Sequence, residues 1–62
     1  MDKQALLNYW AGELIAVKME LEKIAFLLQA GVKNKEIEKH LNNMLDRKKN
    51  LEALIEEIRN QK

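Results

Sequence analysis

The chain has 62 residues, a formal net charge of +1, 47% hydrophobic and 34% charged residues, and no cysteine. A chain this short buries only about 60% of its unfolded surface, and without cysteine no disulfide can stabilise it, so we expect one domain, residues 1–62, that depends on assembly. The composition is too apolar for a disordered chain and too charged for a membrane span, and the near-neutral charge does not indicate a strongly basic nucleic-acid binder.

The first predicted element is a helix over about residues 3–30. This segment is rich in Ala, Leu, Glu, Lys and Met, which favour helix, and Asp2 is suited to cap its N-terminus. Gly31 stands where a helix end calls for a positive φ angle, and Val32 follows it in the position of the usual hydrophobic contact. The sequence therefore predicts a turn over residues 31–34.

The second predicted element is a helix over about residues 35–59. Asn34 is suited to cap it, and Glu36 is well placed against the positive end of the helix dipole. A connection of only about four residues makes the two helices antiparallel neighbours. The predicted fold class is therefore all-α, an antiparallel two-helix hairpin of the coiled-coil type.

Apolar residues recur in both predicted helices at alternating spacings of three and four, the pattern of a heptad seam. Folded at the turn, these positions form seven layers in which the two residue numbers always add to 65. The layers are Leu28–Ile37, Ile24–Leu41, Leu21–Met44, Val17–Lys48, Leu14–Leu51, Trp10–Ile55 and Leu7–Ile58. We expect the stem of Lys48 to pack in this seam while its ammonium reaches solvent, Glu13 or Glu20. Two ion pairs are expected across the seam edges, Glu20–Arg47 and Lys18–Glu52.

The first predicted helix carries more apolar surface than one neighbouring helix can cover. Ile15, Met19 and Phe26 fall on the side away from the seam, and the small Gly12 among them would let another backbone approach. Burying each large side chain contributes about 1.5–3 kcal/mol, which favours a homodimer of two hairpins in a four-helix bundle, or a helix of another protein in the same place. The predicted interface residues are Leu6, Tyr9, Gly12, Ile15, Met19 and Phe26.

Little in the chain favours catalysis. It contains no Cys, Ser or Thr, so thiol and hydroxyl nucleophiles are absent. His40 follows Glu36 by one helical turn, but no second His completes a metal site, and we expect His40 beside Leu27 or Glu20. We therefore predict no catalytic residue, cofactor or metal. The longest apolar run is five residues, over 24–28, and no signal-peptide pattern is present, so we expect a cytoplasmic chain without a membrane partner.

A local resemblance concerns residues 30–41. With Gly31, Glu36, Ile37 and Leu41, this run resembles the turn and first helix of bacterial helix-turn-helix regulators, whose pattern there is close to G-x-S-x-x-E-I-A-x-x-L. Glu38 stands where that family has a small Ala, and the helical pattern continues past Leu41 without a turn or a recognition helix. We therefore interpret the run as the end of one helix and the capped start of the next.

Two functions stay open. The first is a small non-enzymatic regulatory or adaptor protein that acts through helix-mediated protein–protein interaction and self-association. The second is a nucleic-acid-binding dimer, because residues 32–50 carry a local net charge of +3 and two such helices could form one basic surface. Its architecture would be similar to that of small plasmid RNA-binding proteins that are dimers of helical hairpins. The candidate contacts are Lys35, Lys39, Arg47 and Lys49. Acidic residues interleave with them, so we favour the first function.

Overall fold

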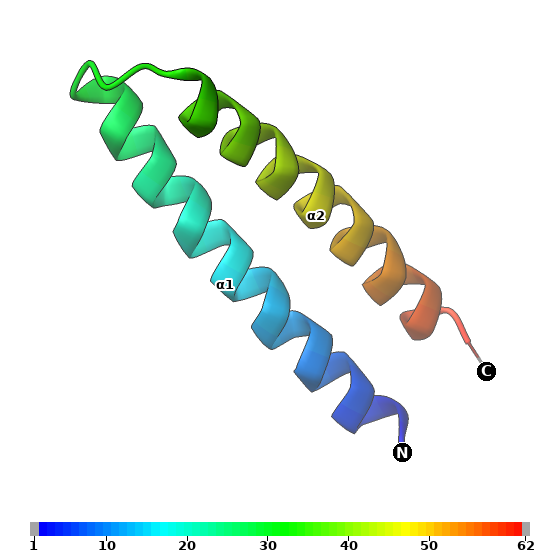
Figure 1. The fold of residues 1–62 in the computed structure, drawn as a ribbon. Coiled ribbons are helices and arrows are strands. Elements are labelled where there is room, and N and C mark those ends of the chain that lie inside the picture. Colours follow the sequence, from blue (N-terminus) through cyan, green and yellow to red (C-terminus); the bar gives the residue numbers. More distant parts are fainter. Residues whose placement is uncertain (1, 62) are drawn as a thin grey trace.

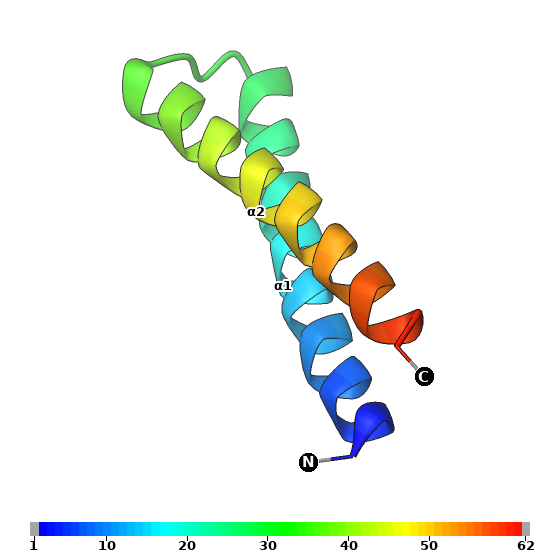
Figure 2. The ribbon, with the colours of Figure 1, turned by 90° about the vertical axis from the view of Figure 1, so that its right-hand side faces the viewer.

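The chain folds as two long helices joined by a short turn. The computed structural model describes residues 2–61, with α1 over Lys3–Gln29 and α2 over Lys35–Arg59. The two helices run side by side in opposite directions, and both chain ends lie at the end of the rod away from the turn (Figure 1). The rod measures 47 × 14 × 14 Å, and a second view, in which α2 passes across α1, shows that the helix axes are inclined to each other (Figure 2). The predicted all-α antiparallel hairpin is confirmed.

Both helix N-termini are capped by the side chains that the sequence indicates. The Ala5 backbone N–H donates to Asp2 Oδ1 at 2.9 Å, and the Ile37 N–H donates to Asn34 Oδ1 at 2.8 Å. Each contact satisfies one of the N–H groups that a helix start leaves without a backbone partner. The caps therefore fix where each helix begins.

The turn follows from the end of α1. Gly31 has a φ angle of 88°, and the Val32 N–H donates to the Leu27 carbonyl at 3.0 Å while the Gly31 N–H donates to the Leu28 carbonyl at 3.1 Å. This pair of bonds is a Schellman motif, which needs a left-handed residue where Gly31 stands. Helix α1 ends at Gln29, one residue before the end that the sequence indicated, because Ala30 serves as the C-cap.

The core lies along the predicted seam. Its most buried side chains are Val17, Ile24, Leu51 and Ile58, which are 2–6% exposed. All fourteen seam positions are buried or half-buried. Beyond them, within residues 2–61, only four side chains are less than exposed: Leu6, Glu13, Glu20 and Leu54. The heptad pattern thus identifies the covered face of each helix.

One edge of the hairpin, which we call the closed edge, is bridged by polar contacts. Arg47 Nη2 donates to Glu13 Oε2 at 3.2 Å, and His40 Nε2 lies 3.1 Å from Glu20 Oε1. The predicted Glu20–Arg47 pair is therefore wrong: the Glu20 carboxylate is held by His40 nearer the turn, and Arg47 turns to the equivalent acid one heptad away. The closed edge comprises three residues of each helix at seven-residue spacing, namely Leu6, Glu13 and Glu20 with His40, Arg47 and Leu54.

The opposite edge, which we call the open edge, holds no such bridge between the helices among residues 2–61. The predicted Lys18–Glu52 pair is wrong, because the Glu52 carboxylate lies 3.7 Å from the ammonium of Lys48, one turn away on the same helix. Lys48 therefore extends toward this edge rather than to Glu13 or Glu20, with 36% of its side chain exposed. A shallow groove of about 250 Å³ lies here, lined by Leu14, Glu52, Ile55, Glu56 and Arg59.

The end of the rod away from the turn is tied by a lysine of α1. Lys3 Nζ donates to the Arg59 carbonyl at 2.9 Å and to the Gln61 carbonyl at 2.5 Å. The last carbonyls of a helix have no partner within the helix and carry its negative dipole end, so a cation there is favourable. Within the described residues, neither helix is long and apolar enough to cross a membrane.

Candidate protein interface

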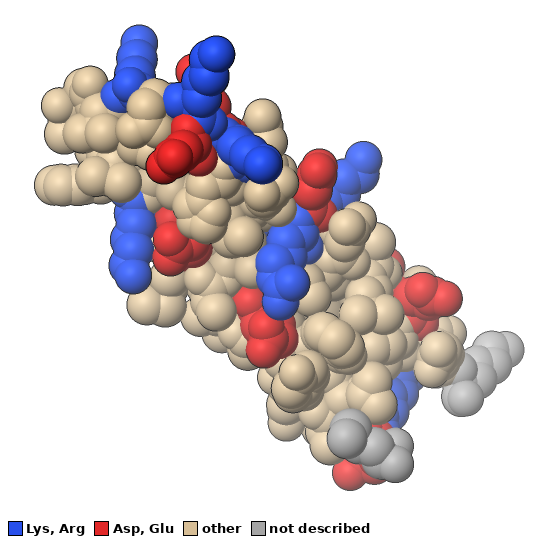
Figure 3. Space-filling model, in the orientation of Figure 1, with Lys and Arg blue, Asp and Glu red and all other residues tan. Residues whose placement is uncertain are grey.

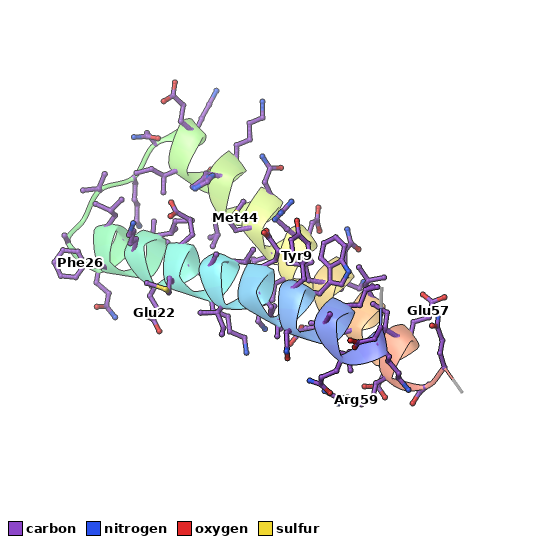
Figure 4. The ribbon with its side chains drawn as sticks, turned by 90° about the horizontal axis from the view of Figure 1, so that it is seen from below. Tyr9, Glu22, Phe26, Met44, Glu57 and Arg59 are labelled. Carbon is purple, nitrogen blue, oxygen red and sulfur yellow. The ribbon has the colours of Figure 1, made fainter. Side chains whose placement is uncertain are left out.

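The side of α1 that faces away from α2 carries a second heptad pattern. Its positions alternate spacings of three and four, and we call them the outer row: Ala5, Asn8, Gly12, Ile15, Met19, Glu22 and Phe26. All of them are exposed. The large apolar members Ile15, Met19 and Phe26 are 59%, 58% and 71% exposed, and Figure 4 shows Phe26 and Glu22 on the side of α1 away from α2. The hairpin thus leaves Ile15, Met19 and Phe26 on α1 without a neighbouring element, with Glu22 between Met19 and Phe26.

Gly12 lies in the middle of the outer row. A Cβ atom built there would meet nothing within 4 Å, so the hairpin itself does not require a glycine at this position. Glycine in a helix interior destabilises the helix by roughly 0.5–1 kcal/mol relative to alanine. Gly12 therefore destabilises α1, and no contact within the hairpin explains why a glycine stands there.

Two of the six predicted interface residues lie elsewhere. Leu6 is half-buried on the closed edge, one heptad from Glu13. Tyr9 is 58% exposed on the flank of α1, and its ring stands edge-on to that of Trp10 at a centroid distance of 4.8 Å and an angle of 83°. Only Gly12, Ile15, Met19 and Phe26 share the outer row. The heptad position of Leu6, next to the seam, is the signal that separates it from the others.

The four predicted nucleic-acid contacts do not form one surface. Lys35, Lys39 and Lys49 occupy the outer side of α2, where Asp46 falls among them, whereas Arg47 points along the closed edge to the Glu13 carboxylate at 3.2 Å. The space-filling view shows basic and acidic side chains mixed along the molecule (Figure 3). The interspersed acidic side chains weaken the field that would hold a phosphate backbone.

The rest of the described surface consists of charged side chains in the open-edge groove and a few exposed apolar side chains. The open-edge groove presents Glu52 and Glu56, and Arg59 Nη1 lies 3.7 Å from the Glu56 carboxylate. No group of three or more His, Cys, Asp or Glu side chains within residues 2–61 could hold a metal ion. Further exposed apolar side chains border the hairpin at Leu27, Val32 and Leu45, at 39%, 39% and 48%.

The fold and surface define a small helical hairpin with one apolar face that lacks a neighbouring element. The chain matches no protein-family model, no curated protein and no solved structure.

Proposed function

We propose that this protein is a small non-enzymatic regulatory or adaptor protein that self-associates through the outer row of α1. The observation that carries the proposal is the exposure of Ile15, Met19 and Phe26 together on one side of one helix. Covering each of them would contribute about 1.5–3 kcal/mol, a sum comparable to the whole stability of a domain of this size. Within residues 2–61 only four side chains are buried, so the gain from pairing is large relative to the hairpin's own core.

The position of the outer row determines the shape of the proposed dimer. Because the row lies opposite α2, two hairpins joined there place both α1 helices in the centre and both α2 helices outside. The four helices then form a layer, with each α1 packed on both sides. A closed four-helix bundle, the arrangement expected from the sequence, would instead require the partner to pack along an edge of the hairpin.

The layer leaves a second surface for a different protein. The open edge carries the exposed Leu45 and the groove of about 250 Å³, and neither takes part in the pairing of α1 helices. The groove combines the apolar Leu14 and Ile55 with charged side chains, and an amphipathic helix of another protein is the kind of partner that such a mixed surface accepts. Binding of such a partner is what would make the protein a regulator or adaptor. The proposal also includes the cytoplasmic location expected from the sequence.

Self-association is tested by measuring mass in solution. At about 10–100 µM, sedimentation equilibrium should give twice the chain mass of 7.3 kDa, and thermal stability should rise with protein concentration. The double substitution Met19→Glu and Phe26→Glu should shift the protein to monomer. The matched control, Asn42→Glu with Ala53→Glu on the outer side of α2, should leave the mass unchanged. A folded wild-type monomer across this range would contradict the proposal.

The layer arrangement of the proposed dimer disfavours the second candidate function, nucleic-acid binding. In the layer, the two α2 helices lie on opposite outer sides, so Lys35, Lys39 and Lys49 of the two copies would not meet in one basic surface. A nucleic-acid binder would shift host RNA or DNA in a gel at about 50 mM salt and lose that shift at about 200 mM. Loss of the same shift in a Lys35→Glu, Lys49→Glu variant would favour nucleic-acid binding over the proposed function.

A further inference from the structure

One place along the outer row is bordered only by apolar residues and glycine. On a helix surface, residues at i, i+3, i+4 and i+7 form a hole that a side chain of a facing helix can enter. Gly12, Ile15, Ala16 and Met19 form such a hole, and all four are exposed. We call it the Gly12 hole. The next holes toward the turn contain charged residues, namely Lys18, Glu22 and Lys23.

The side chain suited to enter this hole is Phe26. It is the most exposed of the large apolar side chains within residues 2–61, at 71%. It lies about 10 residues beyond the middle of the Gly12 hole, which is roughly 16 Å along a straight helix. Phe26 therefore cannot reach the hole of its own chain, and only another molecule can bring the two together.

We propose that the partner of the outer row is a second copy of this chain in antiparallel orientation, with each Phe26 inserted into the partner's Gly12 hole. This inference rests on the proposed self-association and specifies its register. A two-fold axis that passes between the levels of Glu20 and Leu21 brings Phe26 level with the middle of the partner's hole. Because the contact is symmetric, both holes are filled at once and the assembly closes as a dimer.

The parallel orientation is less favourable for two reasons. Parallel helices would have to slide by roughly 16 Å to bring Phe26 to the hole, which fills only one hole per contact and leaves an open-ended chain of molecules. Parallel helices without that slide would place Glu22 beside the partner's Glu22, where two like charges repel. The antiparallel register instead brings Lys18 within one residue of the level of the partner's Glu22 on the same side of the contact. Two such pairs of opposite charge therefore support it.

The same register accounts for Gly12. A Cβ at position 12 has free space within the hairpin, so glycine there is not needed for its fold. In the dimer, a larger side chain at position 12 would occupy the space that the ring of the partner's Phe26 requires. The helix propensity lost at Gly12 is thus offset by the contact made with the second copy.

The first experiment separates the specific contact from general apolar association. Gly12→Leu adds apolar surface to the outer row but fills the hole, so the dissociation constant of the dimer should rise by about tenfold or more. The control Ala5→Leu adds a similar apolar side chain two turns away, outside the hole, and should leave the constant unchanged or lower. Helix content should be retained in both. If Gly12→Leu tightens the dimer as Ala5→Leu does, the proposed insertion is wrong.

The second experiment reads the orientation directly. Because the chain has no cysteine, Gln4→Cys accepts a single spin label at the far end of α1. The antiparallel register predicts about 50 Å between the two labels, whereas parallel helices in register would hold them within about 15 Å. A dimer with the short distance would overturn the antiparallel register and leave self-association intact. A monomeric protein would overturn self-association itself.

Discussion

At the scale of single residues, the two glycines of the chain have opposite roles. Gly31 has a φ angle of 88°, in the region that favours glycine, and it completes the Schellman motif at the end of α1. Gly12 lies within α1 and has free space around its Cα. The same substitution therefore has opposite consequences at the two sites.

We expect Gly31→Ala to lower the free energy of unfolding of the hairpin by about 1 kcal/mol, because alanine is strained at positive φ. Gly12→Ala should raise it by about 0.5–1 kcal/mol through helix propensity. Urea denaturation followed by circular dichroism measures both. The measurement belongs in the Met19→Glu, Phe26→Glu background, where the proposed dimer does not contribute. Equal signs for the two substitutions would contradict this account.

Asn34 provides a second test at this scale, because its side chain accepts the Ile37 N–H at 2.8 Å at the start of α2. Asn34→Ala should destabilise the hairpin by about 1 kcal/mol, since that N–H loses its partner. The control Asn42→Ala changes an exposed asparagine in the interior of the same helix and should be neutral or slightly stabilising. If the two substitutions have the same effect in chemical denaturation, Asn34 does not act as a cap.

At the scale of the elements, the seam of α2 contains one charged residue. Lys48 is half-buried among apolar seam positions, and its ammonium is held 3.7 Å from the Glu52 carboxylate at the open edge. A polar residue at a seam position commonly fixes register at the expense of stability. Exposed ion pairs of this kind contribute only about 0.2–1 kcal/mol, so the Glu52 contact does not compensate fully for an apolar side chain.

We therefore expect Lys48→Met to stabilise the hairpin by about 1 kcal/mol, because methionine has a similar length and buries its whole side chain in the seam. Lys49→Met, on the exposed outer side of α2, is the matched control and should change stability by less than about 0.5 kcal/mol. Thermal unfolding at one protein concentration compares them. A destabilised Lys48→Met variant would mean that the pair with Glu52 outweighs apolar burial.

At the scale of the whole molecule, the register between the two helices can be tested by crosslinking. Leu21 and Met44 are half-buried seam residues assigned to the same layer, and Figure 4 shows Met44 between the helices. With cysteine at both positions, mild oxidation should form a disulfide within one chain, because opposed seam residues come close enough for that bond. Mass spectrometry after proteolysis identifies the linkage. Crosslinks only between chains would mean that the hairpin exchanges helices with its partner.

Much of this architecture was predictable because strong local preferences determine it. The heptad spacing identified every covered seam position, and the residue types of Asp2, Asn34 and Gly31 indicated the caps and the turn. The contact of His40 with Glu20 was among those expected, but the ion pairs of Arg47 and Glu52 were not predictable. Arg47 has acids on the same edge of α1 at Glu13 and Glu20, and alternatives between exposed charges differ by only about 0.2–1 kcal/mol.

The candidate interface was predictable in part for a similar reason. The spacing of Ile15, Met19 and Phe26 indicated their exposure on the side away from the seam, but grouping by apolar character alone also drew in Leu6, which belongs to the closed edge. The contact of Lys3 with the last carbonyls of α2 was missed, although an antiparallel hairpin brings the start of one helix to the end of the other. A basic residue near the N-terminus was the available signal.

The difference between the closed and the open edge has a consequence for the proposed dimer. A two-fold axis perpendicular to the helix layer turns each hairpin end for end without turning it over, so both open edges lie on the same face of the layer. That face presents Leu45 and the groove twice, while the opposite face presents the Glu13–Arg47 contact twice. A protein with two copies of one recognition helix would therefore meet a bivalent surface, whose second contact forms at a high effective concentration.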